Sequence, residues 1–152
     1  MTTLPVIAMA SDHAGVSLKQ LLLADAAQAG HEVLDLGPKE TASVDYPDYA
    51  HKLADWMKEH PGALGVLICG SGIGMSIAAN RHPHIRAALV STTEQAALSR
   101  QHNNANVLCL GARQISEATA RNCLQRFLTT RFEGGRHETR IRKLSSSSSA
   151  PS

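Results

Sequence analysis

The feature that most constrains the fold is an apolar run that ends in a glycine-rich turn. Residues 64–69 read Leu-Gly-Val-Leu-Ile-Cys, the turn follows as Gly-Ser-Gly-Ile-Gly, and a helical pattern continues to Asn80. A buried strand that passes directly into a helix is typical of parallel α/β sheets, which bind ligands at the carboxyl ends of their strands. Glycines let backbone N–H groups approach an anion, and the positive end of the helix dipole favours negative charge. A thiolate at Cys69 would gain from the same field, so the junction predicts an anion site beside a base or nucleophile.

Four other apolar segments alternate with helical patterns along the chain. The predicted strands are residues 4–9, 32–36, 64–68, 86–90 and 106–110. Apolar spacings of three and four predict helices around residues 18–26, 47–57, 73–80, 91–101 and 120–128. A capping box at Ser91–Glu94 is expected to open the fourth of these helices. The alternation predicts an α/β fold of three layers, a Rossmann-like five-stranded parallel sheet with helices on both faces.

The composition limits the classes of protein to which the chain can belong. Its 152 residues suit one domain, and a net charge of +2 is too small to indicate a nucleic-acid surface. No window approaches the ~18 apolar residues of a membrane span, and the first residues lack a secretory signal pattern. Three cysteines without Cys-x-x-Cys spacing predict neither a disulfide framework nor a zinc site, so we expect a cytoplasmic protein. Residues 1–144 should form the domain, and the serine-rich residues 145–152 a disordered tail.

The glycine turn does not fit the common nucleotide-binding motifs. A dinucleotide fingerprint would need a small residue where Met75 stands and an acidic residue about 20 positions further on, where Ser91 and Thr92 lie instead. A P-loop would need a Gly-Lys-Ser/Thr sequence, which is absent. A purely structural turn stays open as an interpretation, but three glycines within Gly70–Gly74 exceed what a turn needs.

Polar residues also follow the first and fifth predicted strands. Asp12 and His13 end the first strand and Arg113 follows the fifth, so a parallel sheet would bring all three to the edge that carries Cys69. An isolated Asp-His pair is more simply an Asx turn with a solvated histidine. Its place at the carboxyl edge favours a site instead.

Two other groups leave their interpretation open. His102-Asn103 combines an imidazole that can exchange protons near neutral pH with an amide that can hold sugar hydroxyls, but these residues also suit a helix C-cap. Arg136 and Arg140, spaced i, i+4, would present two guanidinium groups suited to a phosphate dianion. A basic terminal segment is more often simply solvated.

Five sequence motifs along the chain resemble, in the same order, motifs of the type B ribose-5-phosphate isomerases. They are Ser11–Gly15, Asp45–Asp48, Cys69–Asn80, Ser99–Asn103 and Glu133–His137, and the resemblance runs from about residue 6 to residue 144. It implies a Rossmann-like fold without a dinucleotide, a homodimer or a tetramer, and active sites built from two subunits. It also implies interconversion of ribose 5-phosphate and ribulose 5-phosphate, in the pentose phosphate pathway, without a metal or other cofactor.

The resemblance further implies a role for each matching residue. Cys69 would be the base that moves a proton between C2 and C1, with Ser71 and the amides of Gly70, Gly72 and Gly74 steadying the enediolate. Asp12 and His102 would serve ring opening, and Asn103 would hold hydroxyls. Phosphate would be bound by His13, Arg113, Arg136 and Arg140, some of them from the partner chain. Tyr46 and Asn80 would line or shape the pocket.

The similar proteins use one of two bases, a cysteine at the Cys69 position or a glutamate on the helix that follows. Met75 occupies the glutamate position here, so only the cysteine version is possible. Ser11 stands where many of the similar proteins carry another small residue, and we expect no effect on the chemistry. An isomerase for a six-carbon substrate, such as allose 6-phosphate or galactose 6-phosphate, stays an alternative, as does a non-catalytic sugar-phosphate sensor. A nicotinamide-dependent enzyme comes third.

Overall fold

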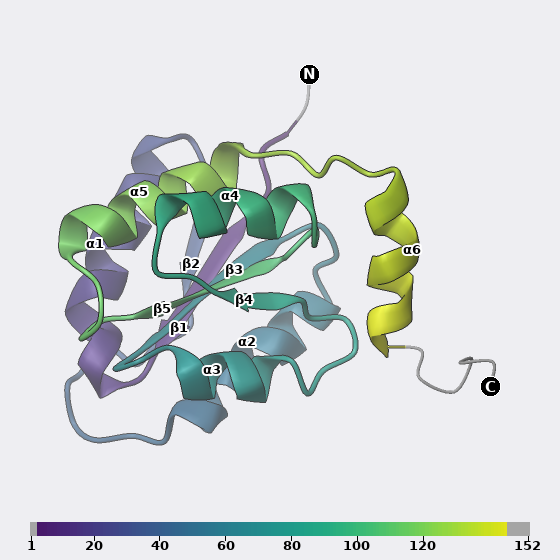
Figure 1. Ribbon diagram of the computed structural model, residues 1–152. Helices are drawn as coiled ribbons and strands as arrows, with labels where there is room; N and C mark the ends of the chain where they lie inside the picture. The colour runs from purple at the N-terminus through teal and green to yellow at the C-terminus, as the bar shows by residue number, and fades with distance from the viewer. Residues whose placement is uncertain (1–2, 146–152) are drawn as a thin grey trace.

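Five parallel strands form one sheet with helices on both of its faces in the computed structural model, which describes residues 3–145 (Figure 1). The strands are β1 (Ile7–Ser11), β2 (Val33–Asp35), β3 (Leu64–Cys69), β4 (Ala87–Leu89) and β5 (Val107–Gly111). The helices are α1 (Val16–Gln28), α2 (Tyr46–Lys58), α3 (Ile73–Ala79), α4 (Thr93–Gln101), α5 (Glu117–Thr129) and α6 (Arg136–Arg142), with 3-10 turns η1 (His13–Gly15) and η2 (Lys143–Ser145). The strand order is β2-β1-β3-β5-β4, which confirms the predicted fold.

Side chains of the three central strands alternate between two hydrophobic cores. Ile7, Met9 and Ile68 belong to the core under α1, α4 and α5. Leu67 and Cys69 belong to the core under α2 and α3. Every residue of β1, β3 and β5 is buried, which is why their sequences read as continuous apolar runs. The alternation turns the Cys69 side chain toward the α3 side of the sheet.

The start of the first strand and the capping box differ from the prediction. β1 begins at Ile7 rather than at residue 4, because Pro5 has no N–H and the first ladder bond runs from Ile7 N to Glu32 O. The capping box at Ser91–Glu94 is wrong by one residue. Thr92 caps α4 by accepting a hydrogen bond from Gln95 N, and Gln95 Oε1 accepts one from Ser91 N.

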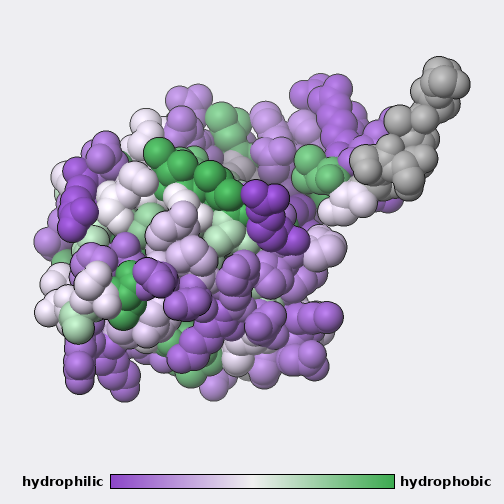
Figure 2. Space-filling model, turned by 90° about the horizontal axis from the view of Figure 1, so that it is seen from below, coloured by the Kyte–Doolittle hydropathy of each residue, from purple (hydrophilic) through white to green (hydrophobic). Residues whose placement is uncertain are grey.

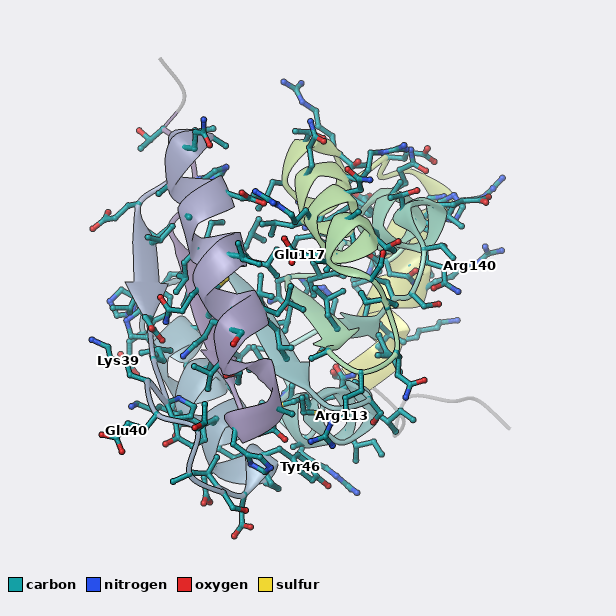
Figure 3. All side chains as sticks on the ribbon, turned by 90° about the vertical axis from the view of Figure 1, so that its left-hand side faces the viewer. Lys39, Glu40, Tyr46, Arg113, Glu117 and Arg140 are labelled. Carbon is teal, nitrogen blue, oxygen red and sulfur yellow. The ribbon has the colours of Figure 1, made fainter. Side chains whose placement is uncertain are left out.

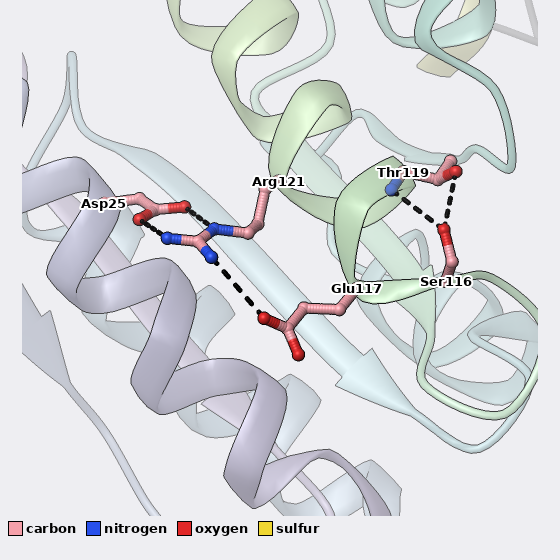
Figure 4. Close-up of polar contacts among 5 residues, drawn as sticks. All are labelled: Asp25, Ser116, Glu117, Thr119 and Arg121. Carbon is pink, nitrogen blue, oxygen red and sulfur yellow. Dashed lines mark hydrogen bonds and ion pairs between the residues drawn. The ribbon is translucent and has the colours of Figure 1, made fainter.

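The outer helices are tied to each other at the surface. Arg121 on α5 donates to both oxygens of Asp25 on α1, at 2.8 and 2.9 Å, and reaches Glu117 at 3.4 Å (Figure 4). Ser116 Oγ caps α5 by accepting from Thr119 N. Because these contacts are exposed to solvent, they contribute little to the free energy of unfolding. They mainly set how α1 lies against α5.

The C-terminal helix stands apart from the two helical layers. After α5 the chain runs along the outside of the fold, and α6 lies beyond the ends of the strands (Figure 1). α6 continues directly into the short η2 turn and contacts the rest of the fold through His137, which is nearly buried and stacks on His102. Ser145, predicted to begin the tail, ends η2, and the rest of that prediction, residues 146–152, lies outside the described residues. No described helix combines the length and apolar character that crossing a membrane requires.

Candidate active site

Three chain segments are joined by hydrogen bonds around the turn that follows β3. Asp12 N donates to Ile68 O at 3.0 Å, Ala112 N to Cys69 O at 2.8 Å and Arg113 N to Gly70 O at 3.0 Å. The carboxyl ends of β1, β3 and β5 therefore meet as one rigid edge. The structure thus places Asp12, Cys69 and Arg113 together, as the parallel sheet predicted.

The Cys69 thiol is enclosed by the turn that it opens. Its side chain is nearly buried, and its Sγ accepts a hydrogen bond from Gly72 N at 3.1 Å. Gly72 has a φ of 80°, a conformation that glycine adopts without strain. Ser71 Oγ accepts from Ile73 N at 3.2 Å, so two of the amides at the start of α3 already have partners within the turn. Burial raises the pKa of Cys109, and the neighbouring Cys69 adds to the effect, so the second thiol on this face of the sheet stays protonated.

The glycines of the turn make room for two side chains that the sequence analysis assigned to the site. A Cβ at Gly74 would lie 2.4 Å from the ring carbons of Tyr46, and a Cβ at Gly70 would lie 3.2 Å from a guanidinium nitrogen of Arg113. Tyr46 and Arg113 therefore lie against the same turn, at the edge of the sheet that Figure 3 shows. The exposed Tyr46 ring forms one wall of the site, and Arg113 brings positive charge to it.

Asp12 and His13 form the opposite side of this edge. Asp12 Oδ1 accepts a hydrogen bond from Ala14 N at 2.9 Å, so the Asx-turn interpretation also holds for this residue. His13 Nδ1 accepts from Val44 N at 3.2 Å, which ties down the loop before α2. The proton of the neutral imidazole must then be on Nε2, which stays available to donate to a ligand.

The remaining predicted residues lie at the other end of the sheet. His102 and Asn103 follow α4, and the chain enters the amino end of β5 at Val107. Arg136 and Arg140 lie on α6, and Figure 3 shows Arg140 well away from Tyr46 and Arg113. The five residues of β5 alone separate the two edges by about 17 Å. Within one chain, these four residues do not meet Cys69.

Asn80 has a structural partner. Its amide donates to Ala87 O at 2.9 Å and accepts from Ala87 N at 2.8 Å, which joins the end of α3 to β4. Together with Asn103 and Ile141 it lines a cleft of about 580 Å³ between the α3–β4 connection and α6. Asn80 therefore lines a cleft near Asn103 and α6, and it does not line the turn that holds Cys69.

His102 forms a cluster with a second histidine, His137, and with Glu133. The rings of His102 and His137 stack with centroids 4.4 Å apart and planes inclined by 16°. Glu133 Oε1 lies 3.8 Å from His102 Nε2 and 3.6 Å from His137 Nε2. Among residues 3–145, these are the one set of three or more histidine, cysteine or acidic side chains whose ligand atoms all lie within 4.8 Å of one another. Nearly parallel rings cannot direct both lone pairs at one ion, so the cluster suits hydrogen bonding better than metal binding.

Comparison with known proteins identifies the family of the chain. A family model described as Ribose/Galactose Isomerase matches residues 7–144. The chain belongs to this family. It is 47% identical over 139 residues to the probable ribose-5-phosphate isomerase B of Mycoplasma pneumoniae, covering 91% of each protein.

Solved structures agree with the family and the fold. Ribose 5-phosphate isomerase B from Anaplasma phagocytophilum has 53% identity and a TM-score of 0.87, covering 95% of this chain and 99% of that one. The Mycoplasma genitalium ribose-5-phosphate isomerase B, solved with bound ribulose-5-phosphate, has 44% identity and a TM-score of 0.89, covering 92% and 93%. The predicted family and the predicted fold are both confirmed.

Two glycines that shape this isomerase-family site were missed by the sequence reasoning. A Cβ at Gly111 would lie 2.5 Å from Ser71 O, and one at Gly15 would lie 2.7 Å from the Ile68 side chain. Both glycines therefore permit the close approach of the segments that surround the turn. Gly111 directly follows the predicted strand 106–110, and a glycine there is a signal of close backbone approach that could have identified it, whereas Gly15 lies in the turn after the first strand and carries no such signal.

Proposed function

We propose that this protein interconverts ribose 5-phosphate and ribulose 5-phosphate, with Cys69 as the base. The observation that carries the proposal is the Sγ of Cys69 at the start of α3, 3.1 Å from Gly72 N, in a member of the Ribose/Galactose Isomerase family. The relative solved with ribulose-5-phosphate supports the choice of a five-carbon substrate. The reaction moves one proton between C2 and C1 through an enediolate, so it requires no cofactor.

The turn can supply both the base and the stabilisation of the enediolate. The hydrogen bond from Gly72 N holds the Cys69 Sγ at the start of α3, beside the amides of the turn. The amides of Gly72 and Ile73 have partners in the turn, whereas helix geometry leaves the N–H of Gly74 without one within α3. We assign stabilisation of the developing oxyanion to this amide together with the Ser71 hydroxyl. Met75 is fully buried and carries no ionisable group, so Cys69 has no rival base on this helix.

We further propose that two copies of the chain share each active site. His102, Asn103, Arg136 and Arg140 lie at the opposite edge of the sheet from Cys69, and a second copy could bring its own set to that turn. Arg136 and Arg140 of one copy would then hold the phosphate beside Arg113 of the other. This arrangement would explain why α6 lies beyond the ends of the strands.

An exposed apolar surface on α3 supports association. Ile73 and Ile77 are 53% and 54% exposed one helical turn apart, and Leu89 on β4 is 42% exposed. Figure 2 shows a hydrophobic band on the face of the molecule that carries α2 and α3. Because α3 also carries the catalytic turn at its start, an interface here would bring a partner close to Cys69.

The three cysteines are unpaired, which agrees with the reducing cytoplasm that we propose for the enzyme.

Replacement of the base tests the proposed function. Cys69→Ala should lower kcat for ribose 5-phosphate by roughly 10³-fold, because a positioned base contributes rates of that order. The matched control is Cys123→Ala, a buried cysteine in the α5 layer, which should keep its activity. Both are measured in a coupled assay of ketose formation. Full activity of Cys69→Ala would contradict the assignment.

The family description also names galactose, so a six-carbon substrate needs its own comparison. The native protein is assayed with ribose 5-phosphate and allose 6-phosphate, and kcat/KM should be higher for the five-carbon substrate. A preference for allose 6-phosphate would change the substrate while leaving the role of Cys69 intact. Absence of turnover with either would favour a sugar-phosphate sensor.

A further inference from the structure

The Glu133-Gly-Gly-Arg-His137 segment is built around His102. Glu133 N donates to Gln101 O at 3.1 Å, which attaches the segment to the end of α4 next to His102. Gly134 and Gly135 follow with φ values of 69° and 60°, and this double left-handed turn brings the chain back so that His137 stacks on the His102 ring. Two consecutive glycines are needed here because other residues rarely adopt this backbone.

The two side chains delivered by the segment restrain His102 in different ways. His137 is nearly buried and forms a flat support beneath the His102 ring, which fixes the plane of that ring. The carboxylate of Glu133 faces the Nε2 edge of both rings, so it is placed to restrain the rotation of His102 within that plane when a hydrogen bond forms. His102 itself is 39% exposed, and no hydrogen bond within residues 3–145 engages its Nδ1.

We propose that Glu133 and His137 are positioning residues for ring opening by His102. This inference rests on the proposed function, in which His102 acts on the cyclic form of ribose 5-phosphate. A carboxylate that holds one imidazole nitrogen leaves the other to exchange a proton with the substrate. The Glu133 to His102 distance of 3.8 Å is longer than a hydrogen bond, and such contacts commonly tighten when a ligand binds.

In ring opening, the Asp12 carboxylate accepts the proton of the O1 hydroxyl as the bond between C1 and the ring oxygen breaks. The ring oxygen receives a proton from Nδ1 of the doubly protonated His102, whose Nε2 edge faces Glu133, and His102 is left as the neutral imidazole. Ribulose 5-phosphate cannot close a comparable ring. Its C5 oxygen carries the phosphate, and its other hydroxyls lie too near the C2 carbonyl to form a five-membered ring with it. A defect confined to His102 therefore affects the aldose far more than the ketose. This difference separates a positioning role from general damage to the site.

The test measures two reactions of the Glu133→Gln variant. Turnover of ribose 5-phosphate should fall by about 10- to 100-fold, the usual effect of losing a residue that orients a catalytic group. Exchange of the C1 proton of ribulose 5-phosphate with solvent, which uses Cys69 as the base but involves no ring opening, should stay within about 2-fold of native. Glu133→Asp should recover part of the lost turnover. Glu138→Gln, on the exposed face of α6, is the matched control and should leave both reactions unchanged.

Glu133 is half exposed, so the substitution should not prevent folding. Equal losses in both reactions, or no loss in either, would overturn the positioning role. Absence of both reactions in the native protein would instead overturn the proposed function, so the two failures are distinguishable.

Discussion

Ser11 is fully buried at the end of β1, and its Oγ is the one buried side-chain polar atom without a hydrogen-bond partner among residues 3–145. A buried hydroxyl without a partner destabilises the folded state, so Ser11→Ala should raise the free energy of unfolding by about 1 kcal/mol. Ser99 is the matched control, because its buried Oγ donates to Ala96 O at 2.8 Å, and Ser99→Ala should not be stabilising. Urea unfolding of both variants measures the difference. Destabilisation of Ser11→Ala to the same extent as Ser99→Ala would contradict the absence of a partner.

At the scale of elements, a buried ion pair joins α1 to the end of β2. Lys19 is completely buried, and its Nζ lies 2.7 Å from Asp35 Oδ1 and also donates to Pro38 O. Lys19→Met should lower the free energy of unfolding by about 2 kcal/mol, less than the loss for a fully buried pair because Asp35 keeps some solvent contact. Urea unfolding at neutral pH checks this. Lys19→Met combined with Asp35→Asn should recover part of the loss, and a double variant less stable than Lys19→Met would contradict the account.

The same pair sets an acid dependence of stability. Burial would raise the pKa of Asp35, but hydrogen bonds from Lys19, Gly37 and Gln20 outweigh it and hold this pKa below its ordinary value of 3.8. A lowered carboxyl pKa contributes stability above the ordinary value, and this contribution is lost as the pH falls through the lowered value. Lys19→Met should therefore differ most from the native protein at neutral pH and converge with it in acid. A difference independent of pH would contradict this.

Sequence patterns predicted the elements whose apolar runs are long and uninterrupted. β3 and the turn after it were predicted closely, because six buried residues are followed at once by three glycines. The start of β1 and the cap of α4 were less predictable, since a single proline or a choice between neighbouring hydroxyls decides them. His31, which lies outside the predicted strands and helices, is buried, and its Nδ1 forms a hydrogen bond with Pro5 O. Burial was predicted from the spacing of apolar residues, and a histidine does not contribute to that pattern.

At the scale of the whole molecule, the candidate site divides into two groups. The residues next to the turn could be predicted to meet, because parallel strands present their carboxyl ends at one edge. The position of α6 could not, because a path over the surface after α5 leaves no apolar pattern that fixes its direction. The family resemblance implied a site shared between subunits, and the distance between the two groups within one chain is the physical reason to propose it.

Mixed dimers of two inactive variants test this central claim most directly. Cys69→Ala and His102→Ala are coexpressed with different tags, and isomerase activity is measured on the purified mixture. In a mixed dimer, one site loses both residues while the other keeps the native Cys69 and the native His102. Random pairing should therefore restore about a quarter of native ribose 5-phosphate turnover, although each variant alone is inactive. Activity no greater than that of the separate variants would contradict a site that joins Cys69 of one chain to His102 of its partner.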